Sequence, residues 1–197
     1  MKRLLILLTI VLALSCFVLM AFVPQKVNTC PVTGDNTGTT KAALHHQQVD
    51  SYKNRGTVPK NYMKIDFSAM SGLKVDNTMS WDMAVYVDGY VLEIQDGGLE
   101  SCNCHSKDFK DTHIYLVQTI NETNKSNAII VEATPRFRAT LGSTNDLKRY
   151  IGKHVRIYGY LFRDDEHKAN STVDEGNGNH WRHSVWEIHP ITKIEAL

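Results

Sequence analysis

The stretch from residue 127 to 162, NAIIVEATPRFRATLGSTNDLKRYIGKHVRIYGYLF, predicts a short helix between two strands. Its first eight residues are rich in Ile, Val and Ala, and Pro135 ends that strand because proline cannot donate a hydrogen bond to a sheet. A capping box over 143–146 starts the helix, and Gly152 stops it. The residues from 154 to 162 then return to the alternating composition of a strand.

Three further segments have the composition of strands: AVYVDGYVLEI at 84–94, DTHIYLV at 111–117, and the C-terminal run 184–197. Together with the two strands above they give the order β-β-β-α-β-β. That order, with the helix between the third and fourth strands, is the arrangement of the OB barrel. The sequence therefore predicts a mainly β protein with helices, whose domain over 84–197 is an OB-like five-stranded barrel.

The residues before the barrel predict an exported protein. A Lys-Arg pair precedes the apolar run 4–23, as in an export signal, and this run is close to the roughly 20 residues that span a bilayer. Residues 1–23 are therefore expected to be a signal peptide or an N-terminal membrane anchor. The rest would then lie outside the cytoplasm, in the periplasm or secreted, with membrane association through the N-terminus.

Two linking regions separate this leader from the barrel. Residues 24–38 are rich in Pro, Thr, Asn and Gly and are expected to form a flexible tether. Residues 39–83 are expected to form a helical arm that packs on the barrel. Its helix would place Leu44, Val49 and Tyr52 on one apolar side.

The charge of the chain is nearly balanced. Without Lys2 and Arg3, the 22 basic residues become 20, against 21 acidic ones, which gives a net charge of −1. A general nucleic-acid binder needs a broad positive field, so no general nucleic-acid binding is expected.

Three cysteines follow the leader, at Cys30, Cys102 and Cys104. Thiols outside the cytosol tend to oxidise, so a disulfide from Cys30 to either Cys102 or Cys104 is expected. The alternative is that Cys102 and Cys104 hold part of a metal site. Their C-x-C spacing differs from the C-x-x-C of zinc knuckles, which favours the disulfide.

Polar side chains alternate with apolar ones on three of the predicted strands and therefore share the side away from the core. The candidate site combines them with residues next to strand ends and in the loop 164–180: Asp111, His113, Glu132, Arg136, Asp165, His167, Glu187 and His189. In one interpretation they form an ordinary solvated sheet face. In the other, His113, His167 and His189 converge with a carboxylate and bind zinc or another divalent metal.

Four sequence motifs carry a resemblance to known proteins. They are ESCNC at 100–104, DxHI at 111–114, VExTPR at 131–136 and WEIHPxTxIE at 186–195. In these the chain resembles a group of uncharacterised exported bacterial proteins, over most of its length after the leader. The resemblance implies an OB-like fold and no mechanism. A looser likeness to thermonucleases concerns the fold alone, because the chain has no matching local motif.

Two functional hypotheses follow from these residues. The first is an extracytoplasmic binding module of unknown ligand, which Asp111, Arg136 and Asp165 would contact on the polar barrel face. The second is a metal-dependent hydrolase related in chemistry to phosphodiesterases and nucleases. In it the three histidines would hold the metal, Glu132 or Glu187 would be the general base, and Arg136 would clamp a phosphate. A third possibility is a structural domain with no ligand.

Overall fold

The computed structural model describes residues 28–72, 81–173 and 179–197. The predicted leader and the start of the predicted tether lie outside this range. Within the described part of the chain, no helix is both long and apolar enough to cross a bilayer.

Five strands close into a barrel: β2 (Ala84–Asp96), β3 (Thr112–Val117), β4 (Ile129–Ala133), β5 (His154–Arg163) and β6 (Trp186–Ala196). Their order is β2-β3-β4-β6-β5, and a pairing between β5 and β2 closes the ring. The β4–β6 pair is parallel and the other pairs within the ring are antiparallel. This confirms the predicted OB-like barrel, with β1 (Met63–Lys64) as an added strand on β2.

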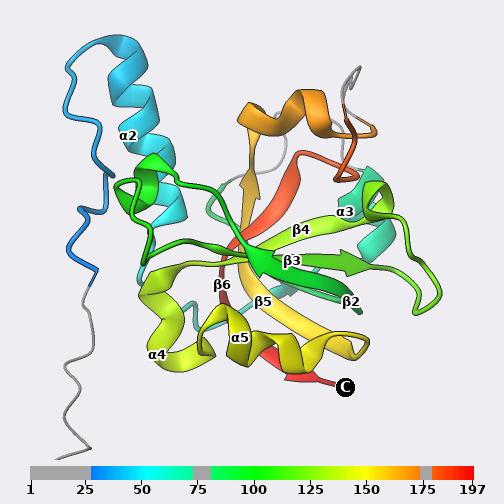
Figure 1. Cartoon of the computed structure of the whole chain (residues 1–197). Helices are drawn as coiled ribbons and strands as arrows, with labels where there is room; N and C mark the ends of the chain where they lie inside the picture. The colour runs from blue at the N-terminus through cyan, green and yellow to red at the C-terminus, as the bar shows by residue number, and fades with distance from the viewer. Residues whose placement is uncertain (1–27, 73–80, 174–178) are drawn as a thin grey trace, which may run out of the picture.

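Short helices fill the connections between the strands (Figure 1). The predicted helix between the third and fourth barrel strands is divided into α4 (Arg138–Leu141), α5 (Thr144–Leu147) and η4 (Lys148–Tyr150). The remaining short helices are α3 (Phe67–Gly72), η1 (Ser101–Asn103), η2 (Lys125–Asn127), η3 (Pro135–Phe137) and η5 (Asp165–Asn170). Of these, η5 occupies part of the predicted loop 164–180 and lies at the top of Figure 1.

The inside of the barrel is apolar. Ile114, Leu116, Val131 and Ile188 are fully buried there, and each such side chain contributes about 1.5–3 kcal/mol through its burial. A Cβ at Gly159 would lie 2.4 Å from the carbonyl oxygen of Pro190, so only glycine allows β5 and β6 to approach each other here.

The arm helix α2 (Lys41–Lys53) forms where the sequence predicted it, but of its predicted apolar side only Val49 and Tyr52 are partly buried. Leu44 is exposed, whereas the polar residues Asp50 and Lys53 are buried. The reason is the surface beneath the helix: Lys53 faces Glu100, and Asp50 accepts a hydrogen bond from Ser101. The helix therefore packs through charged and polar contacts that a hydrophobic pattern does not reveal.

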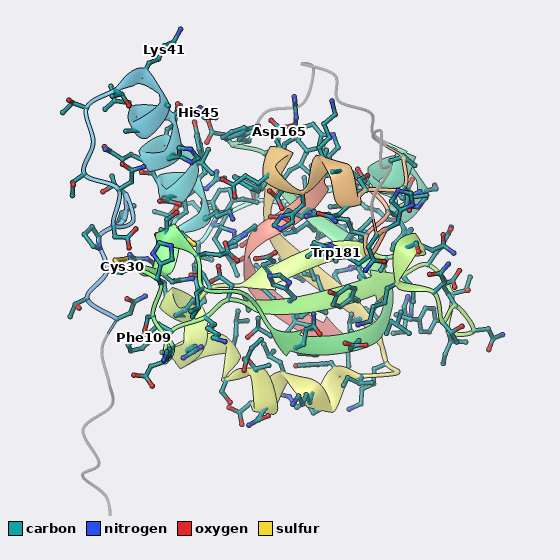
Figure 2. All side chains as sticks on the ribbon, turned by 45° about the horizontal axis from the view of Figure 1, so that its top comes forward. Cys30, Lys41, His45, Phe109, Asp165 and Trp181 are labelled. Carbon is teal, nitrogen blue, oxygen red and sulfur yellow. A yellow bond between two sulfur atoms is a disulfide. The ribbon has the colours of Figure 1, made fainter. Side chains whose placement is uncertain are left out.

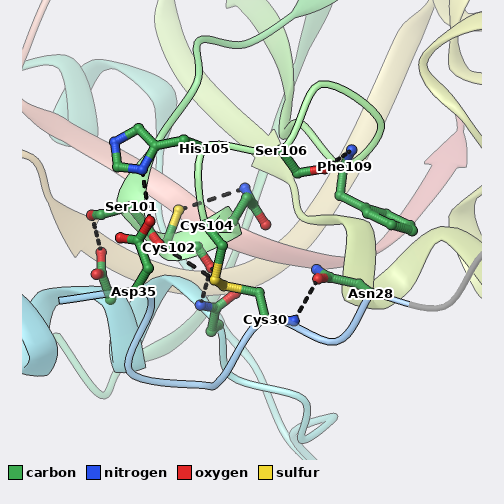
Figure 3. Close-up of a disulfide and its surroundings, with 12 residues drawn as sticks. Asn28, Cys30, Asp35, Ser101, Cys102, Cys104, His105, Ser106 and Phe109 are labelled. Carbon is green, nitrogen blue, oxygen red and sulfur yellow. Dashed lines mark hydrogen bonds and ion pairs between the residues drawn. A yellow bond between two sulfur atoms is a disulfide. The ribbon is translucent and has the colours of Figure 1, made fainter. Parts of the chain in front are cut away.

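A disulfide joins Cys30 to Cys104 across 74 residues, and Cys102 is a buried free cysteine (Figure 3). This confirms one of the two predicted pairings. The bond fastens the segment before α2 to the loop between β2 and β3. A disulfide also indicates an oxidising compartment other than the cytoplasm.

Candidate functional site

A row of three polar side chains crosses three neighbouring strands. His113 on β3 is the register partner of Glu132 on β4. The parallel register of β4 and β6 pairs Val131 with Ile188, so that Glu132 and His189 follow as the next residues on each strand. Because side chains alternate along a strand, all three point to the outer side of the barrel.

This outer side is not a solvated face, and that interpretation of the sequence was wrong. His113 is 9% exposed, Glu132 is 4% exposed and His189 is 0% exposed. The loop between β2 and β3, the C-terminal end of α2 and the segment around Trp181 cover the row. The polar residues therefore form a buried cluster between the barrel and its covering segments.

Contacts within the cluster are short, yet several of its atoms have no hydrogen bond. Nε2 of His113 lies 3.2 Å from Oε1 of Glu132, and Nδ1 of His189 lies 3.2 Å from Oε2 of the same carboxylate. Nε2 of His189 lies 3.6 Å from Oδ2 of Asp111. Four buried atoms of these four residues have no hydrogen-bond partner among the described residues: Oδ1 of Asp111, Nε2 of His113, Oε2 of Glu132 and Nε2 of His189.

These separations fit the edges of a metal coordination shell. Two ligands bound at about 2.0–2.3 Å to one zinc ion at the tetrahedral angle lie roughly 3.3–3.8 Å apart. Asp111, Glu132 and His189 each offer a ligand atom within 4.8 Å of the other two, and Glu100, His113 and Glu132 form a second such group. Glu132 belongs to both groups and so connects them, while His113 and His189 lie in different groups.

The electrostatics of the cluster also indicate a shortage of positive charge. Burial, followed by the neighbouring carboxylates Glu187 and Glu100, raises the pKa of Glu132 well above its usual value. Burial likewise raises the pKa of Asp111. Lys53 supplies one cation: its Nζ donates to Oε2 of Glu100 at 2.7 Å. Burial acts to raise the pKa of Glu100, but the charge and hydrogen bond of Lys53 together with the contribution of His113 lower it.

Arg182 supplies the second buried cation and holds Glu187, the carboxylate that contacts His189. It is 0% exposed and donates to Asp164 at 2.7 Å and to Oε2 of Glu187 at 2.8 Å. The other oxygen of Glu187 lies 3.3 Å from Nδ1 of His189. This contact turns Nε2 of His189 towards Asp111, in the way that a carboxylate fixes the ring of a metal-binding histidine.

His167, the third predicted histidine ligand, belongs to neither ligand group described above. Its Nδ1 lies 2.5 Å from Oδ2 of Asp164, and this hydrogen bond raises the pKa of His167. Burial alone would raise the pKa of Asp164, but the bond from His167 and the charge of Arg182 hold it well below its usual value. The pair lies beside the cluster and extends the ion network of Arg182.

A pocket of about 350 Å³ opens at the edge of the cluster. It is lined by Gln95, Asp96, Gly97, Gly98, Glu100, His113, Tyr115, His167 and Trp181. A Cβ at Gly97 would lie 2.8 Å from Nε2 of His113, so glycine makes room for that imidazole. The ring of Trp181, visible beside the sheet in Figure 2, lies nearly parallel to that of His113 at 6.4 Å between centroids.

Two of the predicted ligand-binding residues lie elsewhere. Arg136 donates to Oδ1 of Asn54 and to the carbonyl of Cys30, and so it holds the segment before α2, while Asp111 and Cys102 act on its charge. Asp165 accepts a hydrogen bond from Arg163, with its side chain 51% exposed. The side chains of both residues are held by hydrogen bonds to residues outside the two ligand groups.

Sequence reasoning missed three members of the site, Lys53, Glu100 and Arg182, whereas it considered Cys102 as a disulfide partner and as part of a metal site with Cys104. Glu100 lies in the ESCNC motif, which was the one available signal for it. Lys53 and Arg182 are charged residues on a helix and in a loop, where exposure is the ordinary expectation.

A scan of the chain against protein-family models gave no match, and a search of curated proteins gave none either.

Proposed function

We propose that this protein is an extracytoplasmic binding module whose ligand is a divalent transition-metal ion of the zinc class. The observation that carries the proposal is the set of four buried atoms without hydrogen bonds, on Asp111, His113, Glu132 and His189. Buried polar atoms are normally paired, because an unpaired one costs about 1–3 kcal/mol. Because Glu132 belongs to both ligand groups, a cation bound to its carboxylate can also be bound by Asp111 and His189 or by His113.

The charge of the region supports a doubly charged ion. Five carboxylates meet in the ion network: Glu100, Asp111, Glu132, Asp164 and Glu187. Against them stand Lys53, Arg182 and, below its raised pKa, His167. When all five carboxylates are ionised and the two ligand histidines are neutral, as metal binding requires, the carboxylates exceed these three cations by two charges, and a divalent cation stabilises this ionised state.

The types of ligand select among divalent ions. Imidazole and carboxylate together suit zinc and its first-row neighbours, whereas magnesium and calcium prefer oxygen ligands alone. Glu187 behind His189 provides the outer hydrogen bond that such a ligand needs.

Metal analysis tests this proposal. Protein purified without a histidine tag and dialysed against zinc should retain about one equivalent, and the double variant His113→Ala/His189→Ala should retain far less. The matched control is His45→Ala/His46→Ala, which removes two exposed histidines of α2 and should leave zinc binding unchanged. If the wild-type protein binds no zinc, the proposal is refuted, and Lys53 is then a cation that balances the carboxylates without a metal.

The pocket beside His113 favours a second candidate, a metal-dependent hydrolase. Glu100 and His113 connect the cluster to this pocket, and the metal would polarise a bound ester or phosphodiester there. Trp181 would pack against the substrate, and protonated His167 would attract an anionic group. Glu187 is held by Arg182 and does not line the pocket, so Glu100 replaces it as the accessible carboxylate.

Turnover distinguishes the two candidates. A hydrolase should cleave chromogenic phosphodiesters or esters when loaded with zinc, lose this activity in chelator, and show an altered KM in Trp181→Ala. Zinc binding without turnover of any such substrate supports the binding module alone.

A further inference from the structure

Cys102 contacts the carboxylates of the cluster and is not part of the disulfide. It is 1% exposed, and its Sγ lies 3.6 Å from Oε2 of Glu100 and 3.7 Å from Oδ2 of Asp111. These three residues form a further group whose potential ligand atoms all lie within 4.8 Å of one another. Asp111 also belongs to the group that contains His189, so the two groups share this carboxylate, while Cys102 and His189 lie in different groups.

We infer that Cys102 supplies a thiolate ligand to the metal ion, which makes the site selective for thiophilic ions such as zinc, cobalt and cadmium. The inference rests on the proposed metal-binding function and adds to it the identity of one ligand and the class of ion. A buried ligand atom without a hydrogen bond, Oδ1 of Asp111, belongs to a residue of the cysteine's own group, and a second such atom, Nε2 of His189, lies 3.6 Å from the other oxygen of Asp111.

The surroundings of the sulfur differ from those of an ordinary buried cysteine, which packs as a small apolar group. Here the side-chain amide of Asn103 donates to Sγ at 3.5 Å, and two carboxylates face it. An amide donor favours the thiolate form, which is the form that binds metals. Lys53 lies close enough to favour the thiolate as well, although burial and the carboxylates dominate and raise the thiol pKa while no metal shares the site.

The two cysteines of the C-x-C motif therefore have different roles. The helix η1 ends at Cys104, whose backbone is left-handed with φ 51°. Figure 3 shows the sulfur of Cys104 bonded to Cys30, with the sulfur of Cys102 separate from that bond. One cysteine fastens the arm and the other contacts the cluster, which also explains how a thiol persists in an oxidising compartment: burial and the metal both protect it.

Ion selectivity follows from the added sulfur. A thiolate raises affinity for zinc, cobalt and cadmium relative to magnesium and calcium. Zinc bound by the protein should therefore survive a large excess of magnesium, and cadmium should displace it.

Cobalt(II) provides the direct test because a cobalt–thiolate bond has an intense charge-transfer absorption in the near ultraviolet that oxygen and nitrogen ligands do not produce. The full chain, kept non-reducing so that the Cys30–Cys104 bond remains, is loaded with cobalt, and its bound metal is counted separately. We expect the band in the wild-type protein and its loss in Cys102→Ser and Cys102→Ala. The matched control Cys16→Ser should keep the band.

The outcomes separate this inference from the proposed function. Cobalt bound without the band, or with a band that persists in both Cys102 variants, overturns the cysteine ligand and leaves metal binding intact. Failure to bind cobalt and zinc overturns both. If the Cys102 variants do not fold, the wild-type band and its retention in Cys16→Ser decide the question, since Cys102 is the one free cysteine among the described residues.

Discussion

Both sides of the β3–β4–β6 sheet are buried, the inner side among apolar side chains and the outer side among polar and charged ones. The inner side presents Ile114, Val131 and Ile188, and the outer side presents His113, Glu132 and His189. Apolar burial inside is non-directional and tolerates exchange of similar side chains. Outside, each buried charge needs a partner at a defined position, so the same degree of burial makes that side sensitive to single substitutions.

The largest predicted effect concerns Arg182 on the outer side. In Arg182→Met, Asp164 and Glu187 stay buried without their cation, so we expect a loss of about 3–5 kcal/mol in the free energy of unfolding. Urea unfolding measures it. On the inner side Ile188→Val should cost only about 0.5–1.5 kcal/mol.

A second arginine serves as the control for this comparison. Arg156 makes a two-pronged pair with Asp88 at 2.7 and 2.8 Å, but this pair is solvent-accessible, so Arg156→Met should cost far less than Arg182→Met. Equal losses for the two arginine variants would show that burial does not set the cost of breaking an ion pair in this protein.

The next effect depends on metal. At a zinc concentration 100 times the Kd, the wild-type protein should gain about 2.7 kcal/mol of stability over protein in chelator. Glu132→Gln removes the carboxylate shared by both ligand groups while keeping its shape, so most of this gain should disappear. Thermal unfolding with and without zinc measures the difference. The inner-side variant Ile188→Val should keep the full gain, and loss of the gain in both variants would argue against a site on the outer side.

The smallest predicted effect is a pH dependence from His167. Since folding raises the pKa of His167, its bond to Asp164 contributes stability that is fully present below the unfolded pKa of about 6.5. This contribution is lost as the pH rises through the higher folded-state pKa. The Tm of wild-type protein in chelator should therefore decrease over that range more than the Tm of His167→Gln.

His45→Gln on the exposed side of α2 is the control for this measurement and should retain the wild-type dependence of Tm on pH. Identical pH profiles for His167→Gln and the wild type would mean that the pair with Asp164 adds nothing to stability.

Much of the fold could be predicted from local patterns. Alternation located the strands, Pro135 and Gly152 marked the ends of elements, and the position of the helix between strands gave the barrel order. The site was harder, because Glu100, Lys53 and Arg182 come from a loop, a helix end and a second loop with no shared period. Their meeting depends on contacts between distant segments, which no window of sequence contains.

The sequence by itself determined the alternation of polar and apolar side chains on β3, β4 and β6, the barrel order, and a choice of two partners for Cys30. Only the tertiary structure decided that the polar side is buried. Alternation says which residues share a side of a sheet, but covering that side depends on the disulfide-fastened arm and on the segment around Trp181, which pack over it from far along the chain. Burial then turns an ordinary set of polar side chains into a charged cluster, because removing water strengthens electrostatic interactions and makes an unpaired charge costly.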